Sequence, residues 1–304
     1  MKKGLIFVLF TAVISGVSVF VNKFAVQSVG NSHVFTTGKN LFVALVLSLF
    51  IFSPFIVNKL KSIKKNEWVK LVVIGFVGGS IPFLLFFKGL SLATSTNAAF
   101  IHKTLFIWVS LLAITFLKEK IGKIQIAALL FLLLGNYLLI GIKAWSFGLA
   151  DILILGATLL WSVEFIVAKK LLKNIEPEIV AWARMLFGAI LLLAFLVFTG
   201  QAQGLVNLQT SQMSWIIVTA VLLLGYVWTW YHALARLPAS VVTSVLVIAS
   251  PITTVLNKIF VQGDISIVQW LGILIIGLSV AGLCRFLSKL QQPEIAQQEL
   301  FIEE

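Results

Sequence analysis

Charged residues are scarce in this chain. Asp, Glu, Lys and Arg make up 11% of its 304 residues, whereas apolar residues make up 60%. A soluble domain carries roughly 25% charged residues, so this composition cannot cover a water-soluble surface and excludes a soluble enzyme. A spanning helix needs about 20 largely apolar residues, and the chain has room for roughly ten.

Cysteine and the common catalytic motifs are also missing. Cys284 is the single cysteine, which excludes an internal disulfide and a thiolate metal cluster. There is no His-Glu-x-x-His or Gly-x-Ser-x-Gly motif, no pair of carboxylates deep in an apolar run and no Gly-x-x-x-x-Gly-Lys-Ser/Thr loop. We therefore expect no catalytic residue, metal or cofactor, and no direct drive by ATP.

Apolar runs between turn and charge signals predict an all-α integral membrane protein with ten transmembrane helices. The first five are Gly4 to Gln27, Val34 to Val57, Val69 to Leu92, Asn97 to Leu117 and Ile124 to Ile142. The next five are Leu149 to Leu171, Glu178 to Thr199, Trp215 to Leu237, Ala239 to Val261 and Val268 to Leu287.

Lys and Arg gather in alternate loops. The segments 58–70 and 118–123 are rich in Lys, whereas 27–32, 91–96 and 201–214 contain neither residue. Because basic loops stay on the cytoplasmic side, this pattern predicts a multi-pass protein of the cytoplasmic membrane with both termini in the cytoplasm. The formal charge of +12 then reflects these loops, so the expected partners are the lipid bilayer and a small-molecule substrate, not nucleic acid.

The two halves of the sequence resemble each other. Phe87-Lys88-Gly89-Leu90 matches Tyr231-His232-Ala233-Leu234, Gly38-Lys39-Asn40 matches Ala183-Arg184-Met185, and 116–121 matches 260–265 with a one-residue shift. Five spans is an odd number, so the second copy enters the membrane from the opposite side. The sequence thus predicts two inverted five-helix repeats, 4–142 and 148–287, with a shared site near mid-membrane. Residues 288–304 form a polar cytoplasmic tail that we expect to be partly disordered.

The residues resemble the EamA family of the drug/metabolite transporter superfamily over nearly the whole chain. The resemblance rests on the ten spans, the duplicated Phe/Tyr-x-Gly/Ala-Leu segment, Leu117-Lys118-Glu119, Leu160-Trp161-Ser162 and Pro251. The sequence departs from the family pattern at Gly263-Asp264 and at Ser15-Gly16. The resemblance implies export or exchange of small organic solutes through a central cavity, with the fifth and tenth spans peripheral.

Ionisable residues deep in a span are costly and therefore face a cavity or a partner. His102 and Lys103 in the fourth span and Glu164 in the sixth qualify, and we expect Lys103 and Glu164 to face each other as a charge pair. Arg184, in the first turns of the seventh span, fits a substrate role and snorkelling to the interface equally well. Lys39 is interpreted as an interfacial anchor.

Aromatic and polar side chains supply further candidates for the cavity. Tyr226 and Trp228 lie in an aromatic-rich eighth span and suit recognition of an apolar solute, although an interfacial belt would have the same composition. Asn97, Thr104 and Trp108 recur on one side of the fourth span. They predict either a polar cavity stripe or hydrogen bonds between helices.

Two prolines are hinge candidates. Pro82 follows Gly75-x-x-x-Gly79 in the third span, and Pro251 lies in the ninth. Proline removes a backbone hydrogen bond, so either can bend its helix. Gly277-x-x-x-Ala281 in the tenth span would allow a second copy of the chain to pack as a homodimer.

These features predict a secondary transporter that exports small organic metabolites, such as amino-acid-like solutes, by alternating access. A passive channel or a non-transport membrane scaffold is the alternative that composition leaves open. An intramembrane enzyme is disfavoured by the missing motifs.

Overall fold

A computed structural model describes residues 2–51, 54–140 and 147–300, in which the regular structure is helical throughout. The first repeat contains α1 (Lys2–Val29), α2 (Ser32–Ile51), α3 (Pro54–Lys61), α4 (Lys65–Val77), α5 (Ile81–Leu92), α6 (Ser95–Lys103), α7 (Leu105–Leu112), η1 (Ala113–Leu117) and α8 (Lys123–Ile140). The second contains α9 (Leu149–Leu171), α10 (Pro177–Phe198), α11 (Gln203–Val206), α12 (Thr210–Arg236), α13 (Ala239–Val245), η2 (Leu246–Ile248), α14 (Ala249–Asn257), η3 (Lys258–Gln262) and α15 (Ile267–Leu300).

The all-α membrane fold predicted from hydropathy is confirmed. Within the described residues, nine helical segments are long and apolar enough to cross a bilayer. The predicted fifth span corresponds to α8, a shorter apolar helix that adjoins residues 141–146, which are outside the described part. Counting α8, the described residues contain ten spanning segments, five in each repeat.

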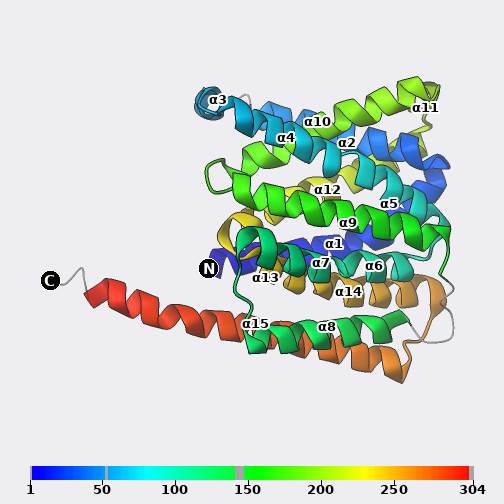
Figure 1. The fold of residues 1–304 in the computed structure, drawn as a ribbon. Helices are drawn as coiled ribbons and strands as arrows, with labels where there is room; N and C mark the ends of the chain where they lie inside the picture. Colours follow the sequence, from blue (N-terminus) through cyan, green and yellow to red (C-terminus); the bar gives the residue numbers. More distant parts are fainter. Residues whose placement is uncertain (1, 52–53, 141–146, 301–304) are drawn as a thin grey trace.

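The two repeats run in opposite directions and interlock. In Figure 1, α1 leads away from the end that carries the N-terminus, whereas α9 leads back towards it. The most extensive packing joins helices of different repeats: α1 packs on α12, α5 on α9, α2 on α10 and α8 on α15. One repeat alone therefore does not bury all of its apolar surface, and helices of both repeats form the centre of the bundle.

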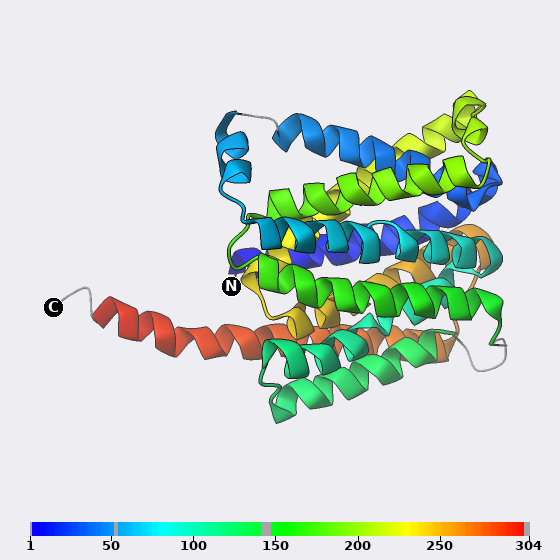
Figure 2. The same cartoon turned by 45° about the horizontal axis from the view of Figure 1, so that its top comes forward.

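One end of the bundle gathers the lysine-rich segments. The N-terminus, α3 and the final turns of α15 lie at this end (Figures 1 and 2). The second span is shorter than predicted, because α2 ends at Ile51 and 54–61 form the separate helix α3. Helix α15 continues into the expected polar tail as far as Leu300, and residues 301–304 are outside the described part. The expectation that this tail is partly disordered stays a prediction.

Three spans are interrupted near their middle. The third breaks between α4 and α5, where Pro82 occupies the first turn of α5, a position at which no intrahelical N–H is lost. The α-helix of the fourth span is interrupted at Thr104, between α6 and α7. The ninth span contains the 3-10 turn η2 shortly before Pro251. The fourth and ninth spans also end alike, in the π-helical turns η1 and η3.

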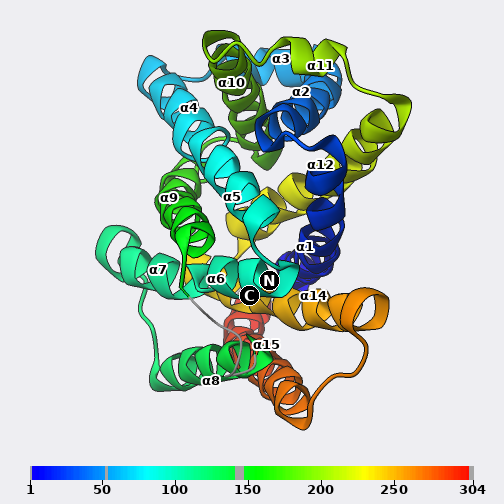
Figure 3. The same cartoon turned by 90° about the vertical axis from the view of Figure 1, so that its right-hand side faces the viewer.

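The fifth and tenth spans form a pair at the edge of the bundle, as the resemblance implies. Viewed along the helices, α8 and α15 stand together beside the other eight spans (Figure 3). Their backbones cross closely: a Cβ atom on Gly135 would lie 3.0 Å from the Gly272 carbonyl, and one on Gly272 would lie 2.7 Å from the Gly135 carbonyl. The pocket described below uses neither helix.

Candidate functional site

A central pocket lies at mid-length of the helices, between the two repeats. Its cavity volume is about 60 Å³, which is smaller than that of a typical site occupied by a small molecule. Both repeats contribute to its wall. The lining residues are Ser15, Ser18, Val19, Asn22, Lys39, Phe83, Phe86, Phe87, His102, Trp161, Phe165, Arg184, Leu223 and Tyr226.

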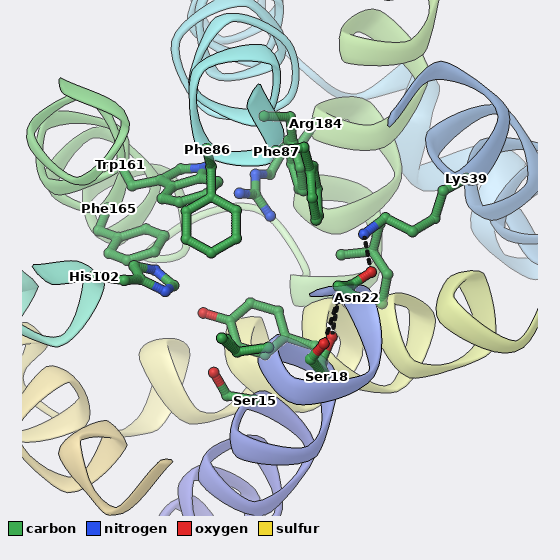
Figure 4. Close-up of a pocket in the computed structure, with 14 residues that line it drawn as sticks. Ser15, Ser18, Asn22, Lys39, Phe86, Phe87, His102, Trp161, Phe165 and Arg184 are labelled. Carbon is green, nitrogen blue, oxygen red and sulfur yellow. Dashed lines mark hydrogen bonds between the residues drawn. The ribbon is translucent and has the colours of Figure 1, made fainter. Parts of the chain in front are cut away.

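Two buried cations point into this pocket from different repeats. Lys39 of α2 is 1% exposed and Arg184 of α10 is 2% exposed. Figure 4 shows the Lys39 ammonium and the Arg184 guanidinium directed towards the same space. The two positions correspond in the internal repeat, so the inverted fold brings equivalent side chains to one site from opposite directions.

Each cation rests on an aromatic ring at a matching position of its own repeat. The Lys39 ammonium lies 3.8 Å from the centre of the Phe87 ring, and the Arg184 guanidinium lies 6.0 Å from that of Tyr231. Phe87 and Tyr231 are also equivalent in the repeat. Ring faces attract cations, which stabilises charges in a site that excludes water.

A polar cluster holds Arg184 in place. Its Nε lies 3.8 Å from Glu164 Oε2, and its Nη2 donates to the Gly78 carbonyl at 3.1 Å. The Tyr231 hydroxyl donates to the other Glu164 oxygen at 2.6 Å. Gly78 sits at the break between α4 and α5, so its carbonyl is free of the helix and also accepts a bond from Trp161 Nε1 at 2.9 Å.

Glycines let the third span approach this cluster. A Cβ atom on Gly78 would collide with the Glu164 side chain, and one on Gly79 would collide with the Arg184 carbonyl. Gly75 faces Phe187 and Gly188 of α10 at similarly short range. The Gly75-x-x-x-Gly79 motif thus serves close helix packing, and the backbone break follows at the same place.

The predicted pair of Lys103 and Glu164 is not the arrangement found. Lys103 is buried and its Nζ donates to Ser15 Oγ at 2.8 Å. Glu164 is bound instead by Arg184 of α10 and Tyr231 of α12. Lys103 therefore reaches the pocket wall through a serine, and Glu164 reaches it through Arg184.

Aromatic rings form most of the remaining wall. His102 packs against Trp161 with ring centres 4.9 Å apart and against Phe86 at 5.2 Å. Phe83 meets the Trp161 ring edge-on at 5.4 Å. Tyr226 stacks on Trp230, which is fully buried behind the wall. Such a lining suits a solute with a planar apolar part.

The sequence candidates divide into two groups. His102, Arg184 and Tyr226 line the central pocket, with Lys103 and Glu164 directly behind its wall. The other four lie away from it. Residues two apart on a helix point in nearly opposite directions, so Trp228 turns away where Tyr226 faces inwards, and it stacks on His232 instead.

The predicted polar stripe of the fourth span also lies outside the pocket. Trp108 Nε1 donates to Thr104 Oγ1 at 3.3 Å, and the Asn97 backbone N–H donates to Thr94 Oγ1. These are local bonds within one span, because the pocket side of α6 is occupied by His102.

Lys39 is the residue that the sequence interpretation missed. Its position eight residues into α2 suggested an anchor at the membrane surface, yet it is buried and donates to Asn22 Oδ1 at 3.1 Å. The signal was present in the internal repeat. Because Lys39 matches Arg184, a central site for one implies a central site for the other.

The described residues around the central pocket do not form a metal site. Among the residues that the structure describes, no group of three or more His, Cys, Asp or Glu side chains converges on one point. The polar atoms of the central pocket are suited to binding a solute.

Comparison with known proteins agrees with this architecture. The model of the EamA-like transporter family matches twice, over residues 2–141 and 148–285. The uncharacterized transporter YyaM of Bacillus subtilis (strain 168) is 27% identical over 248 residues, covering 79% of this chain and 80% of its own. One solved crystal structure superposes with a TM-score of 0.69 over 93% of this chain and 99% of its own, at 15% identity, which shows a shared fold. This chain is therefore a membrane transporter protein that belongs to the EamA-like transporter family, within the drug/metabolite transporter superfamily.

Proposed function

We propose that this protein is a secondary transporter that moves small organic solutes across the cytoplasmic membrane by alternating access. The central pocket is the observation that carries the proposal. It lies between interlocked inverted repeats, draws its wall from both and holds one equivalent cation from each. Sites at the repeat interface near mid-membrane are typical of carriers built in this way. Export is the direction that the family resemblance favours.

The interrupted spans support movement around the pocket. The break between α4 and α5, the interruption at Thr104 and the turn η2 all lie near mid-length of their spans. The first two adjoin the pocket residues Phe83 and His102. Non-helical backbone at this depth is tolerated where it is buried in protein or lines a cavity. Pro82 and Pro251 adjoin two of these breaks, and we assign them the role of hinges between the halves of their spans.

A counterflow assay in proteoliposomes tests transport directly. Liposomes preloaded with an unlabelled small organic solute should accumulate the same solute in labelled form transiently, and uptake should saturate. Flux that grows in proportion to concentration without trans-stimulation would indicate a channel. Absence of flux for every solute that binds the purified protein would favour a scaffold.

We also propose that both termini lie in the cytoplasm. The N-terminus, the lysines of α3 and the end of α15 share one end of the bundle (Figure 2), and basic segments remain cytoplasmic. A reporter fused after Glu304 should be active only in the cytoplasm. Activity of that fusion outside the cell would reverse the orientation.

A homodimer through the tenth span stays a prediction. A Cβ atom on Gly277 would have no contact within 4 Å with the described residues, apart from its chain neighbours and the backbone of its own helix, and Ala281 is exposed on the same helix. This small-residue face is therefore available for close helix packing. Gly277→Leu should shift the protein from dimer to monomer in detergent if the face is used.

A further inference from the structure

We infer that the central pocket selects small organic anions with an aromatic or similar planar body, and that it disfavours amines and zwitterionic amino acids. The inference rests on the proposed transport function and names the substrate class of that same pocket. It follows from the balance of charge, the balance of hydrogen-bond donors and the position of the aromatic rings.

Positive charge exceeds negative charge around the pocket. Lys39, Lys103 and Arg184 are each at most 2% exposed, against one carboxylate, Glu164, at 1%. The other buried acid among the described residues, Asp151, accepts a bond from the Gly148 N–H at the start of α9 and does not line the pocket. Charges removed from water without an opposite charge are costly, so an anion is the solute that completes this site.

Several hydrogen-bond donors of the wall are free, whereas the oxygen acceptors of Ser15, Ser18 and Asn22 are occupied. Arg184 Nη1 has no partner among the described residues. The Lys39 ammonium has three N–H groups and donates one bond, to Asn22 Oδ1. Ser15 Oγ already accepts from Lys103, and Ser18 Oγ accepts from Asn22 Nδ2. Their hydroxyl protons remain available, so the wall matches a group that only accepts, such as a carboxylate.

An ammonium group finds no comparable place. Glu164, the acid nearest the pocket, is engaged by Arg184 and Tyr231. The ring faces of Phe83 and Phe87, which could attract a cation, already lie under Arg184 and Lys39 at 5.3 Å and 3.8 Å.

The apolar wall sets the shape of the rest of the solute. Phe86, Trp161 and Phe165 lie across the space from the serines (Figure 4), and Tyr226 also lines the pocket. Rings offset-stacked or edge-on against one another gain energy beyond the area that they bury. A planar body of one ring therefore suits the aromatic side while its anionic group meets Lys39 and Arg184, and the pocket must widen to admit it.

The test uses three solutes that share one skeleton: hydrocinnamate, which is anionic, L-phenylalanine, which adds an ammonium group, and phenylpropylamine, which is cationic. Their binding to the purified full chain in detergent is measured by calorimetry. We expect hydrocinnamate to bind roughly tenfold or more tighter than either amine, a ratio that corresponds to about 1.4 kcal/mol. Equal or tighter binding of L-phenylalanine or phenylpropylamine overturns the inference, and so does the absence of hydrocinnamate binding.

Variants of Lys39 sharpen the result. Lys39→Met should weaken hydrocinnamate binding roughly tenfold, since it removes one charge-assisted bond, and should leave phenylpropylamine unaffected or improved. Lys39→Arg keeps the charge and should keep the preference for the anion even if Lys39→Met does not fold. The matched control is Lys88→Met, which alters an exposed lysine of α5 outside the pocket. Equal losses in Lys39→Met and Lys88→Met contradict the inference.

Counterflow of the same three solutes separates this inference from the transport proposal. Selective binding of hydrocinnamate without counterflow would support the anion site and contradict the proposed transport function. Counterflow of the amines in preference to hydrocinnamate would support the transport function and contradict the preference for anions.

Discussion

The two ends of the bundle are related by the internal repeat, but the hydrogen bonds that join the repeats differ in charge between the two ends. At the end that carries the N-terminus, the Glu119 carboxylate accepts bonds from the Ala239 N–H at 2.7 Å, the Ser240 N–H at 3.2 Å and the Ser240 hydroxyl at 2.6 Å. The bonds join the fourth span to the first turn of α13, whose N–H groups lack partners within the helix and favour negative charge. We call this the Glu119 end.

The opposite end has no such tie in the described part of the chain. Asp264, which matches Glu119 in the repeat, is exposed and has neither a hydrogen-bond nor an ion-pair partner there. The equivalent helix start, at α6, is capped by its own neighbour Thr94. The hydrogen bonds that join the two repeats at this end are neutral: Ser95 Oγ to Asn257 Oδ1 at 3.1 Å, Asn31 Nδ2 to Gln201 Oε1 at 2.8 Å and Gln212 Nε2 to the Ser28 carbonyl at 3.2 Å. The opposite end should therefore separate at lower cost than the Glu119 end.

A second contact is shared by both ends. Lys23 donates to the carbonyls of Leu90 and Ser91, where α5 ends, and Lys169 donates to those of Leu234 and Leu237, where α12 ends. Both lysines satisfy orphan carbonyls at a helix C-terminus, where positive charge is favoured. The lysine contacts each join two helices of the same repeat, whereas the charged contact of Glu119 joins the two repeats and has no charged counterpart among the described residues of the opposite end.

Removing the Glu119 tie should have the largest effect on stability. Glu119→Gln loses the charge on three hydrogen bonds, and bonds to a charged group are worth about 1.5–3 kcal/mol each. Asp264→Asn, the matched change at the opposite end, should alter stability by less than about 0.5 kcal/mol. Thermal unfolding in detergent measures both. Similar melting temperatures for the two variants would remove the asymmetry.

The lysine caps should show a smaller difference between the ends. Lys23→Met and Lys169→Met each lose two bonds to helix carbonyls, and we expect each to destabilise by about 1–3 kcal/mol. Lys169 shares a surface pocket with Glu119, so Lys169→Met and Glu119→Gln should be less than additive. Lys23→Met and Glu119→Gln should add, since their sites lie at opposite ends. Additivity in both double mutants would show that Lys169 acts independently of Glu119.

The turns after the fourth and ninth spans should give the smallest effects. Lys118 has φ of 56° and Gly263 has φ of 71°, each directly after a π-helical turn. A non-glycine residue in the left-handed region costs about 1–2 kcal/mol. Lys118→Gly should therefore stabilise the protein by up to about 1 kcal/mol, and Gly263→Ala should destabilise it by at least as much. Destabilisation by Lys118→Gly, or stabilisation by Gly263→Ala, in the unfolding assay would contradict this explanation from backbone conformation.

Hydropathy and the internal repeat predicted most of the fold, because span length and the odd number of spans per repeat leave few arrangements. The site was predicted in part. Arg184 and His102 were candidates because buried charge and polarity require a cavity or a partner, and Lys39 followed from the repeat but was assigned to the surface.

The partners of the buried charges could not be predicted from spacing. Depth along a helix placed Lys103 and Glu164 in facing spans, but rotation of each helix decides which side chain meets which. Two residues along α12 separate Tyr226, in the pocket, from Trp228, outside it. The break at Gly78, which supplies a carbonyl to Arg184 and Trp161, likewise depends on packing between spans.

The central claim is that the pocket opens first at the end opposite Glu119. A cysteine at Ser18, on the pocket wall, tests it in a Cys284→Ser background, since Cys284 is the single native cysteine. A membrane-impermeant thiol reagent is applied to vesicles of either orientation. The account predicts labelling from the side remote from Glu119 in the otherwise native protein, and labelling from both sides once Glu119→Gln is added. Labelling from the Glu119 side without that substitution would contradict it.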